Sequence, residues 1–152
     1  MIFIILIISF ILELLFTNII PLNSILIPMF TLVSLVLLYP LFKNKNNYLI
    51  TCLIVGLLYD IYCSSLFINT LTFSLCGYLI SIIFHFITVN IQSNILISII
   101  LIILFRTISY TLLTINDYTM FNINILLKGI YSSLIINLIY AFILNIIIKI
   151  KE

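Results

Sequence analysis

Six apolar stretches follow one another through the chain, separated only by short polar breaks. The chain is 65% hydrophobic and 7% charged, with a mean hydropathy of +1.46. A transmembrane helix needs about 20 apolar residues, and we place six spans near 2–20, 24–42, 48–64, 69–89, 95–115 and 123–148. The breaks between them are short, so neighbouring spans must run antiparallel. The sequence therefore predicts an all-α polytopic membrane protein, a compact bundle of six transmembrane helices.

No stretch of the sequence is long and polar enough to form a domain outside the membrane. The longest hydrophilic segment is Lys43–Asn47. We therefore expect a single integral membrane domain over residues 1–152. The net charge of +2 is small and scattered, and no basic patch exists, which argues against a nucleic-acid partner.

The distribution of lysines predicts the orientation in the membrane. With six spans both termini lie on one side, together with Lys43 and Lys45 of the second break and with Lys149 and Lys151. Only Lys128 lies near the opposite face. Because cytoplasmic loops carry an excess of Lys and Arg, we expect both termini to be cytoplasmic.

Charged side chains inside the apolar stretches are the strongest candidates for a functional site. A carboxylate at mid-bilayer depth costs roughly 2.5–3.5 kcal/mol on insertion scales, so such residues usually face the protein interior. Glu13, Asp60 and Arg106 fall at similar depths of the first, third and fifth spans, whereas His85 lies near a span end. We expect Arg106 to neutralise one carboxylate, ideally through a bidentate contact, and the other carboxylate to be either protonated or hydrogen-bonded to hydroxyls.

This charged cluster allows two interpretations. It can be a proton or ligand site inside the bundle, or it can be a structural cluster that determines which helices pair. We favour the structural interpretation, because a transporter would usually offer more polar residues around its pathway. Each span also carries small or polar residues at helical spacing, as in Gly56, Asp60 and Ser64. Such stripes let membrane helices approach closely and predict the seam of the bundle.

Signatures of enzymes are missing from the sequence. It contains no His-Glu-x-x-His, no Asp-rich motif for a metal-bound diphosphate and no phosphate-binding glycine loop. Asp117 falls in the break before the last span, far from any paired-carboxylate geometry with Asp60. We expect neither catalysis nor a cofactor or metal. The three cysteines lack metal or redox spacing and are expected to pack as small, polarizable side chains.

The segment around Asp60 resembles the rod-shape-determining MreD family. The resemblance rests on Gly-x-x-x-Asp from Gly56 to Asp60 in the third span, followed by Asn69-Thr70-Leu71 and Gly77-Tyr78-Leu79. It is close over about 54–80 and extends elsewhere through the number and spacing of the spans. The family usually has glycines in the loop after the aspartate, whereas Ser64 and Ser65 stand here.

The resemblance implies a multi-pass protein of the bacterial inner membrane that acts as a non-catalytic subunit of the cell-elongation complex. Its partners would be a single-span MreC-like protein and, directly or indirectly, MreB filaments, a RodA-like glycosyltransferase and a penicillin-binding protein. Peptidoglycan synthesis would be localised through that assembly. Gly56 and Asp60 would shape the third helix, with Gly77, Glu13 and Arg106 as further structural or partner-binding candidates.

The same resemblance supplies an alternative function. The family is thought to share its fold with the substrate-binding components of energy-coupling-factor vitamin transporters. A protein of that kind would bind a small molecule in an outward-facing polar pocket near Glu13, Asp60 and Arg106. The short, apolar external breaks argue against it, because they offer no obvious lid over a ligand.

Overall fold

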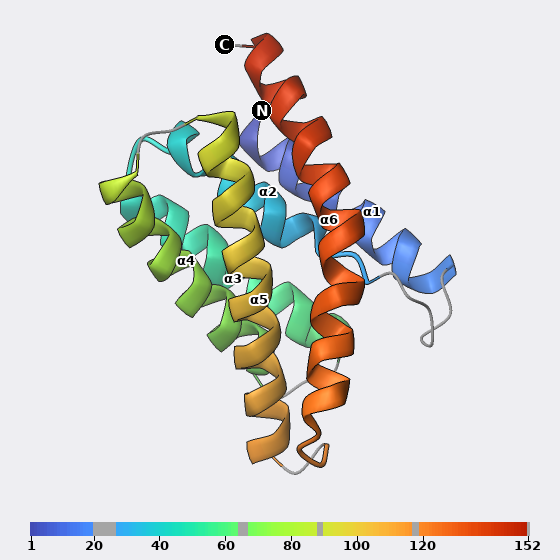
Figure 1. Cartoon of the computed structure of the whole chain (residues 1–152). Coiled ribbons are helices and arrows are strands. Elements are labelled where there is room, and N and C mark those ends of the chain that lie inside the picture. The colour runs from blue at the N-terminus through green and yellow to red at the C-terminus, as the bar shows by residue number, and fades with distance from the viewer. Residues whose placement is uncertain (20–26, 64–66, 88–89, 117–118, 152) are drawn as a thin grey trace.

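The computed structural model describes residues 1–19, 27–63, 67–87, 90–116 and 119–151, and all regular structure in these ranges is helical. Figure 1 shows the six α-helices and one short 3₁₀ helix. They are α1 (Ile2–Ile19), α2 (Phe30–Leu38), η1 (Tyr39–Leu41), α3 (Lys45–Cys63), α4 (Ile68–Phe86), α5 (Ile91–Ile115) and α6 (Ile123–Lys151). Five of the α-helices begin and end within a few residues of the predicted spans, so the all-α prediction is confirmed.

Four of these helices, α3 to α6, are long and apolar enough to cross a membrane. The prediction of a full-length second span is wrong, because α2 has only 9 residues, about 14 Å of helix against roughly 30 Å of hydrocarbon. Two prolines explain its length. Pro28 lies just before α2, and Pro40 has no N–H to donate to a carbonyl of the preceding turn, so the α-helix ends at Leu38 and the chain continues as the short 3₁₀ helix η1.

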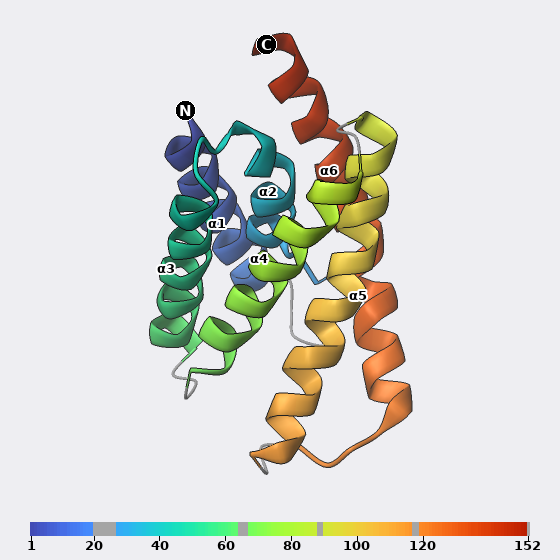
Figure 2. The same ribbon diagram turned by 90° about the vertical axis from the view of Figure 1, so that its left-hand side faces the viewer.

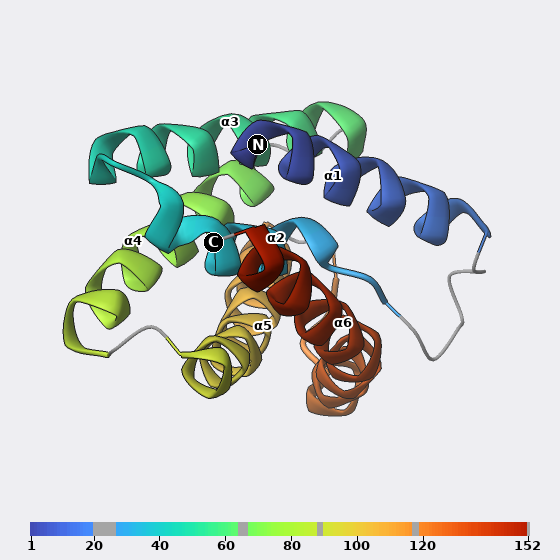
Figure 3. The ribbon, with the colours of Figure 1, turned by 90° about the horizontal axis from the view of Figure 1, so that it is seen from above.

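The short helix α2 occupies the centre of the molecule. All of its residues are buried, and it packs against α1, α4, α5 and α6. Figure 3 shows it between α1 on one side and the α5–α6 pair on the other. Its sequence, FTLVSLVLL, is apolar on every side, which is the pattern of a helix enclosed by others. The bundle therefore has a short core helix instead of six equal members.

The remaining long helices form two antiparallel pairs, α3 with α4 and α5 with α6. In Figure 2 the end of α5 and the start of α6 extend well past the end of α3 and the start of α4, so the two pairs are unequal in length at this end of the molecule. Both termini and the connection from α2 to α3 lie at the other end.

Polar side chains join the helices inside the bundle, as the stripes predicted. The hydroxyl of Ser9 on α1 lies 2.6 Å from those of both Ser34 on α2 and Tyr140 on α6. On α6, Asn145 accepts a hydrogen bond of 3.2 Å from the amide of Asn94 on α5. Ser9, Ser34, Asn94 and Asn145 are all buried, so these contacts are made away from the surrounding membrane.

Asn137 of α6 holds the non-helical segment that leads into α2. Its Oδ1 accepts a hydrogen bond of 2.7 Å from the backbone N–H of Met29, and its Nδ2 donates one of 3.1 Å to the carbonyl of Ile27. The Ile27 N–H donates to the carbonyl of Ser132. Non-helical backbone survives at membrane depth only where protein satisfies its polar groups. One amide on α6 thus makes the sharp entry into the core helix possible.

Candidate functional site

Asp60 lies near the end of α3 and binds the beginning of α4. Its Oδ1 accepts a hydrogen bond of 2.9 Å from the backbone N–H of Asn69. Its Oδ2 accepts one of 2.8 Å from the N–H of Thr70 and one of 2.5 Å from the Thr70 hydroxyl. The first N–H groups of a helix have no partner within it, and the carboxylate supplies the missing acceptors. Asp60 is therefore a buried cap on the next helix.

Gly56, one turn before Asp60, makes this contact possible. A Cβ added at Gly56 would lie 2.5 Å from the Cα of Thr70 and 3.0 Å from the carbonyl oxygen of Asn69. No side chain fits in that space, so only glycine lets the α4 backbone approach α3 closely enough for Asp60 to reach it. The Gly-x-x-x-Asp spacing thus has a physical basis: the glycine admits the helix start, and the aspartate four residues later caps it.

Gly77, further along α4, also allows α3 and α4 to pack closely. A Cβ at this position would lie 2.6 Å from the Sγ of Cys52 on α3. Both residues are buried, so Gly77 and Cys52 form a second close contact between α3 and α4. The predicted packing role of Cys52 agrees with this geometry, and α3 and α4 pack closely along both glycine positions.

Glu13 on α1 caps the start of α2 in the same way that Asp60 on α3 caps the start of α4. Its Oε2 accepts two hydrogen bonds of 2.9 Å, from the backbone N–H and from the hydroxyl of Thr31 in the first turn of α2. The Tyr59 hydroxyl lies 2.7 Å from the same Thr31 hydroxyl and ties α3 to this cap. Glu13 is buried, at 8% exposure. Each carboxylate thus binds both the N–H and the hydroxyl of one threonine at the start of the following helix.

The two carboxylates share a physical cause. Neither α2 nor α4 has a cap from its own N-cap side chain, which is Met29 in α2 and Phe67 in α4. A helix N-terminus carries about half a positive charge, so a carboxylate from the preceding helix both neutralises it and satisfies its N–H groups. Sequence reasoning missed the roles of Thr31 and Thr70. The sequence does contain a signal for these contacts, because a threonine stands in the first turn of the helix that follows each intramembrane carboxylate.

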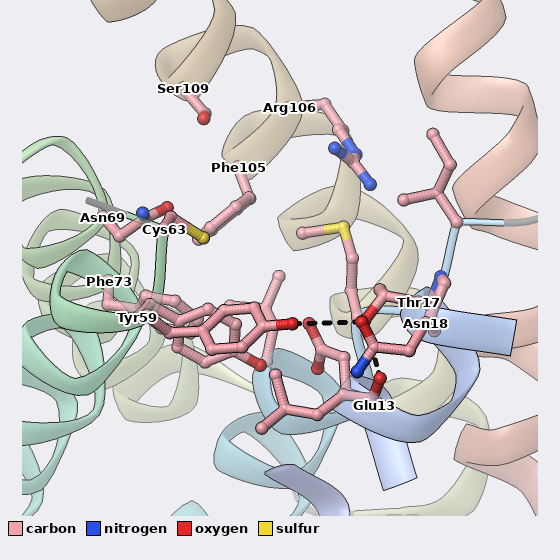
Figure 4. A pocket seen from close by; sticks show the side chains of 16 residues that line it. Glu13, Thr17, Asn18, Tyr59, Cys63, Asn69, Phe73, Phe105, Arg106 and Ser109 are labelled. Atoms are coloured by element: carbon pink, nitrogen blue, oxygen red, sulfur yellow. Dashed lines mark hydrogen bonds between the residues drawn. The ribbon is translucent and has the colours of Figure 1, made fainter. Parts of the chain in front are cut away.

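Arg106 of α5 faces a cavity of about 400 Å³ that opens among α1, α3, α4 and α5. Figure 4 shows its guanidinium pointing from α5 into this cavity, on the same side as Glu13, Thr17 and Asn18. Its charge attracts that of Glu13. However, the described residues contain no ion pair of Arg106, and its Nε is buried without a hydrogen-bond partner. The structure therefore shows no bidentate contact of Arg106 among the described residues, and Glu13 and Asp60 each bind a helix N-terminus instead.

The structure brings together only part of the predicted cluster. Glu13 and Arg106 line the same cavity, whereas Asp60 points to the start of α4 and lies outside the cavity lining. His85 lies in the last turn of α4, away from these charges, as expected. Asp117 falls outside the described residues. Within the described ranges no three His, Cys, Asp or Glu side chains converge as a metal site would require.

Comparison with known proteins places this architecture in a family. Residues 1–150 match the family described as rod shape-determining protein MreD. No curated protein and no solved structure matches the chain. The matched region spans the two capping carboxylates and both close-packing glycines, and it covers nearly all of the 152 residues. The chain belongs to the MreD family of rod shape-determining membrane proteins.

Proposed function

We propose that the protein is a non-catalytic membrane subunit of the bacterial cell-elongation complex and helps to localise peptidoglycan synthesis through an MreC-like single-span protein. The family match over residues 1–150 carries this proposal. MreB filaments, a RodA-like glycosyltransferase and a penicillin-binding protein are the further partners that we infer, directly or through the MreC-like protein.

The use of the buried carboxylates supports a structural role. A catalytic or proton-carrying carboxylate needs access to a substrate or to a relay of exchangeable groups. Asp60 instead accepts hydrogen bonds from two backbone N–H groups and a hydroxyl, and Glu13 from one N–H and one hydroxyl. These contacts fix the helix starts. Rigid helix pairs of this kind suit a subunit that presents its outer faces to partner helices.

The outer faces offer large apolar surfaces for such partners. On α6, for example, the side chains of Ile135, Ile139 and Phe142 are each more than half exposed. In a bilayer these faces contact lipid or another helix, and association there depends on packing rather than on the hydrophobic effect. We infer that the MreC-like span docks on such a face.

We further propose that the chain lies in the bacterial inner membrane as a multi-pass protein with both termini cytoplasmic. Both termini and the connection that carries Lys43 lie at one end of the molecule, while the start of α6, near Lys128, lies at the other. Alkaline phosphatase fused after Asn122 is therefore expected to be active, and the same reporter fused after Asn44 inactive. Activity measured in intact cells checks this, and the reverse pattern would contradict the orientation.

Purification of the tagged chain from its native membranes tests the proposed function. In mild detergent we expect mass spectrometry to recover the MreC-like protein, with the RodA-like and penicillin-binding proteins in smaller amounts. The matched control is an unrelated polytopic protein of the same membrane, tagged and expressed equally. Recovery of an ATPase pair with a transmembrane coupling subunit, and of no elongation protein, would overturn the proposal.

The alternative of a vitamin-transporter component gains no support from the comparisons. No solved structure matches the chain, so the expected likeness of fold to those components has no structural relative behind it. We do not propose that function.

A further inference from the structure

Arg106 is the one intramembrane charge that the fold leaves without an acceptor among the described residues. Its Nε is buried and has no hydrogen-bond partner, and no ion pair or hydrogen bond joins its guanidinium to another described residue. A guanidinium carries five N–H donors, and a buried donor left unbonded costs about 1–3 kcal/mol. The carboxylates that sequence reasoning offered as partners are both bound to helix starts. Within the described part of the chain the arginine therefore has no acceptor, and a ligand in the cavity beside it would supply one.

The cavity beside Arg106 has the size and the lining of a site for an amphiphile. Its volume of about 400 Å³ lies within the usual range of ligand pockets, about 300–1,000 Å³. The apolar part of the wall comes from four helices and the segment before α2, and its members are Leu14, Met29, Leu32, Phe73 and Phe105. Polar groups that can hydrogen-bond a ligand are also present, at Thr17, Asn18, Asn69 and Ser109. The positive charge of Arg106 thus faces a cavity lined by both apolar and polar side chains.

We propose that this cavity binds the phosphate head group of a membrane phospholipid, with Arg106 as its main ligand. The planar guanidinium matches two phosphate oxygens at once, and the apolar wall receives the glycerol and the first carbons of the acyl chains. Glu13 faces the same cavity, but one of its two oxygens, Oε2, accepts two hydrogen bonds from Thr31, and its charge is offset by the N-terminus of α2. It therefore does not oppose an anion as a free carboxylate would.

The lipid is favoured over a soluble phosphate by the position of the cavity. It lies between helices, three of which, α3, α4 and α5, are long and apolar enough to cross the membrane. Its lining includes Cys63 at the end of α3 and Asn69 at the start of α4, and this is the end at which α5 and α6 extend past the α3–α4 pair (Figure 2). A molecule with a charged head and apolar tails fills both parts of such a wall, whereas a soluble phosphate satisfies only the arginine.

Native mass spectrometry of the purified, delipidated protein tests this proposal. Phosphatidylglycerol is the probe, dioleoylglycerol is the same lipid body without phosphate, and glycerol 3-phosphate is the soluble phosphate. We expect the wild type to retain phosphatidylglycerol in preference to both other probes. Because hydrogen bonds to a charged group contribute about 1.5–3 kcal/mol, Arg106→Gln should weaken retention about tenfold or more. Arg106→Lys should recover part of it.

Two further variants keep the test decisive. Lys128→Gln removes an exposed positive charge from α6 at the end where the cavity lies, and it should bind as the wild type does. Ser109→Phe leaves Arg106 in place and fills part of the cavity, so it should weaken retention even if Arg106→Gln fails to fold. Circular dichroism establishes which variants are folded. Unchanged retention in a folded Arg106→Gln or Ser109→Phe protein, equal loss in Lys128→Gln, or equal binding of glycerol 3-phosphate would each overturn the proposal.

Discussion

Asp60→Ala is expected to lower the free energy of unfolding by about 4 kcal/mol. The substitution removes the acceptor of three hydrogen bonds and leaves the backbone N–H groups of Asn69 and Thr70 without a partner at the buried start of α4. Lost helix caps cost about 0.5–2 kcal/mol at ordinary sites, and the charge and the burial here raise that figure. Titration of the purified protein with sodium dodecyl sulfate, followed by circular dichroism, measures the change.

Two variants isolate the role of the carboxylate. Ile61→Ala changes the next residue, whose side chain is 77% exposed, and should alter stability by less than about 0.5 kcal/mol. Asp60→Asn keeps one carbonyl oxygen as an acceptor and loses the charge, so its effect should fall between the other two. If Asp60→Ala and Ile61→Ala prove equally stable, Asp60 does not cap α4. Loss of the elongation partners from a stable Asp60→Ala protein would instead assign the residue to partner binding.

Gly56→Ala is expected to be the most damaging single-methyl addition in the chain, with a loss of about 3 kcal/mol. The added Cβ would lie 2.5 Å from a backbone atom, the Cα of Thr70, and backbone cannot swing aside as a flexible side chain can. The helices must separate, which also draws α4 away from Asp60. Gly129→Ala is the matched control, because nothing lies within 4 Å of the added atom. There the change should be neutral or stabilising by up to about 1 kcal/mol, the difference in helix propensity.

The energetic coupling between Gly56 and Asp60 tests the close approach more directly. If Gly56→Ala acts by moving α4 out of reach of Asp60, the losses from Gly56→Ala and Asp60→Ala should not add. A double-mutant cycle with the detergent titration measures this, and neighbouring residues typically show coupling energies of about 0.5–3 kcal/mol. Full additivity would show that glycine and aspartate act independently. Equal stability of Gly56→Ala and Gly129→Ala would contradict the close approach itself.

The helices were largely predictable, and the exception is instructive. Length and hydropathy identify five of the six α-helices to within a few residues, because any apolar stretch in a membrane must satisfy its backbone internally. The second stretch has the same composition, but Pro28 and Pro40 shorten its helix to 9 residues. The predicted span 24–42 runs through both prolines because hydropathy does not register the missing N–H of proline. The predicted stripe on the third span also identified part of the seam, because Gly56 and Asp60 are buried against α4, whereas Ser64 lies outside the described residues.

By itself, the sequence determined that this is a helical membrane protein, that its intramembrane carboxylates face the protein interior, and that its Gly-x-x-x-Asp segment resembles the MreD family. These properties follow from composition and local spacing. Only the tertiary structure decided what the charges contact. Charge alone suggested that Arg106 pairs with a carboxylate, yet Glu13 and Asp60 each bind a helix N-terminus. The physical reason is that a helix start presents its unpaired N–H groups and partial positive charge only once the chain has folded, and neither appears in a count of charged residues.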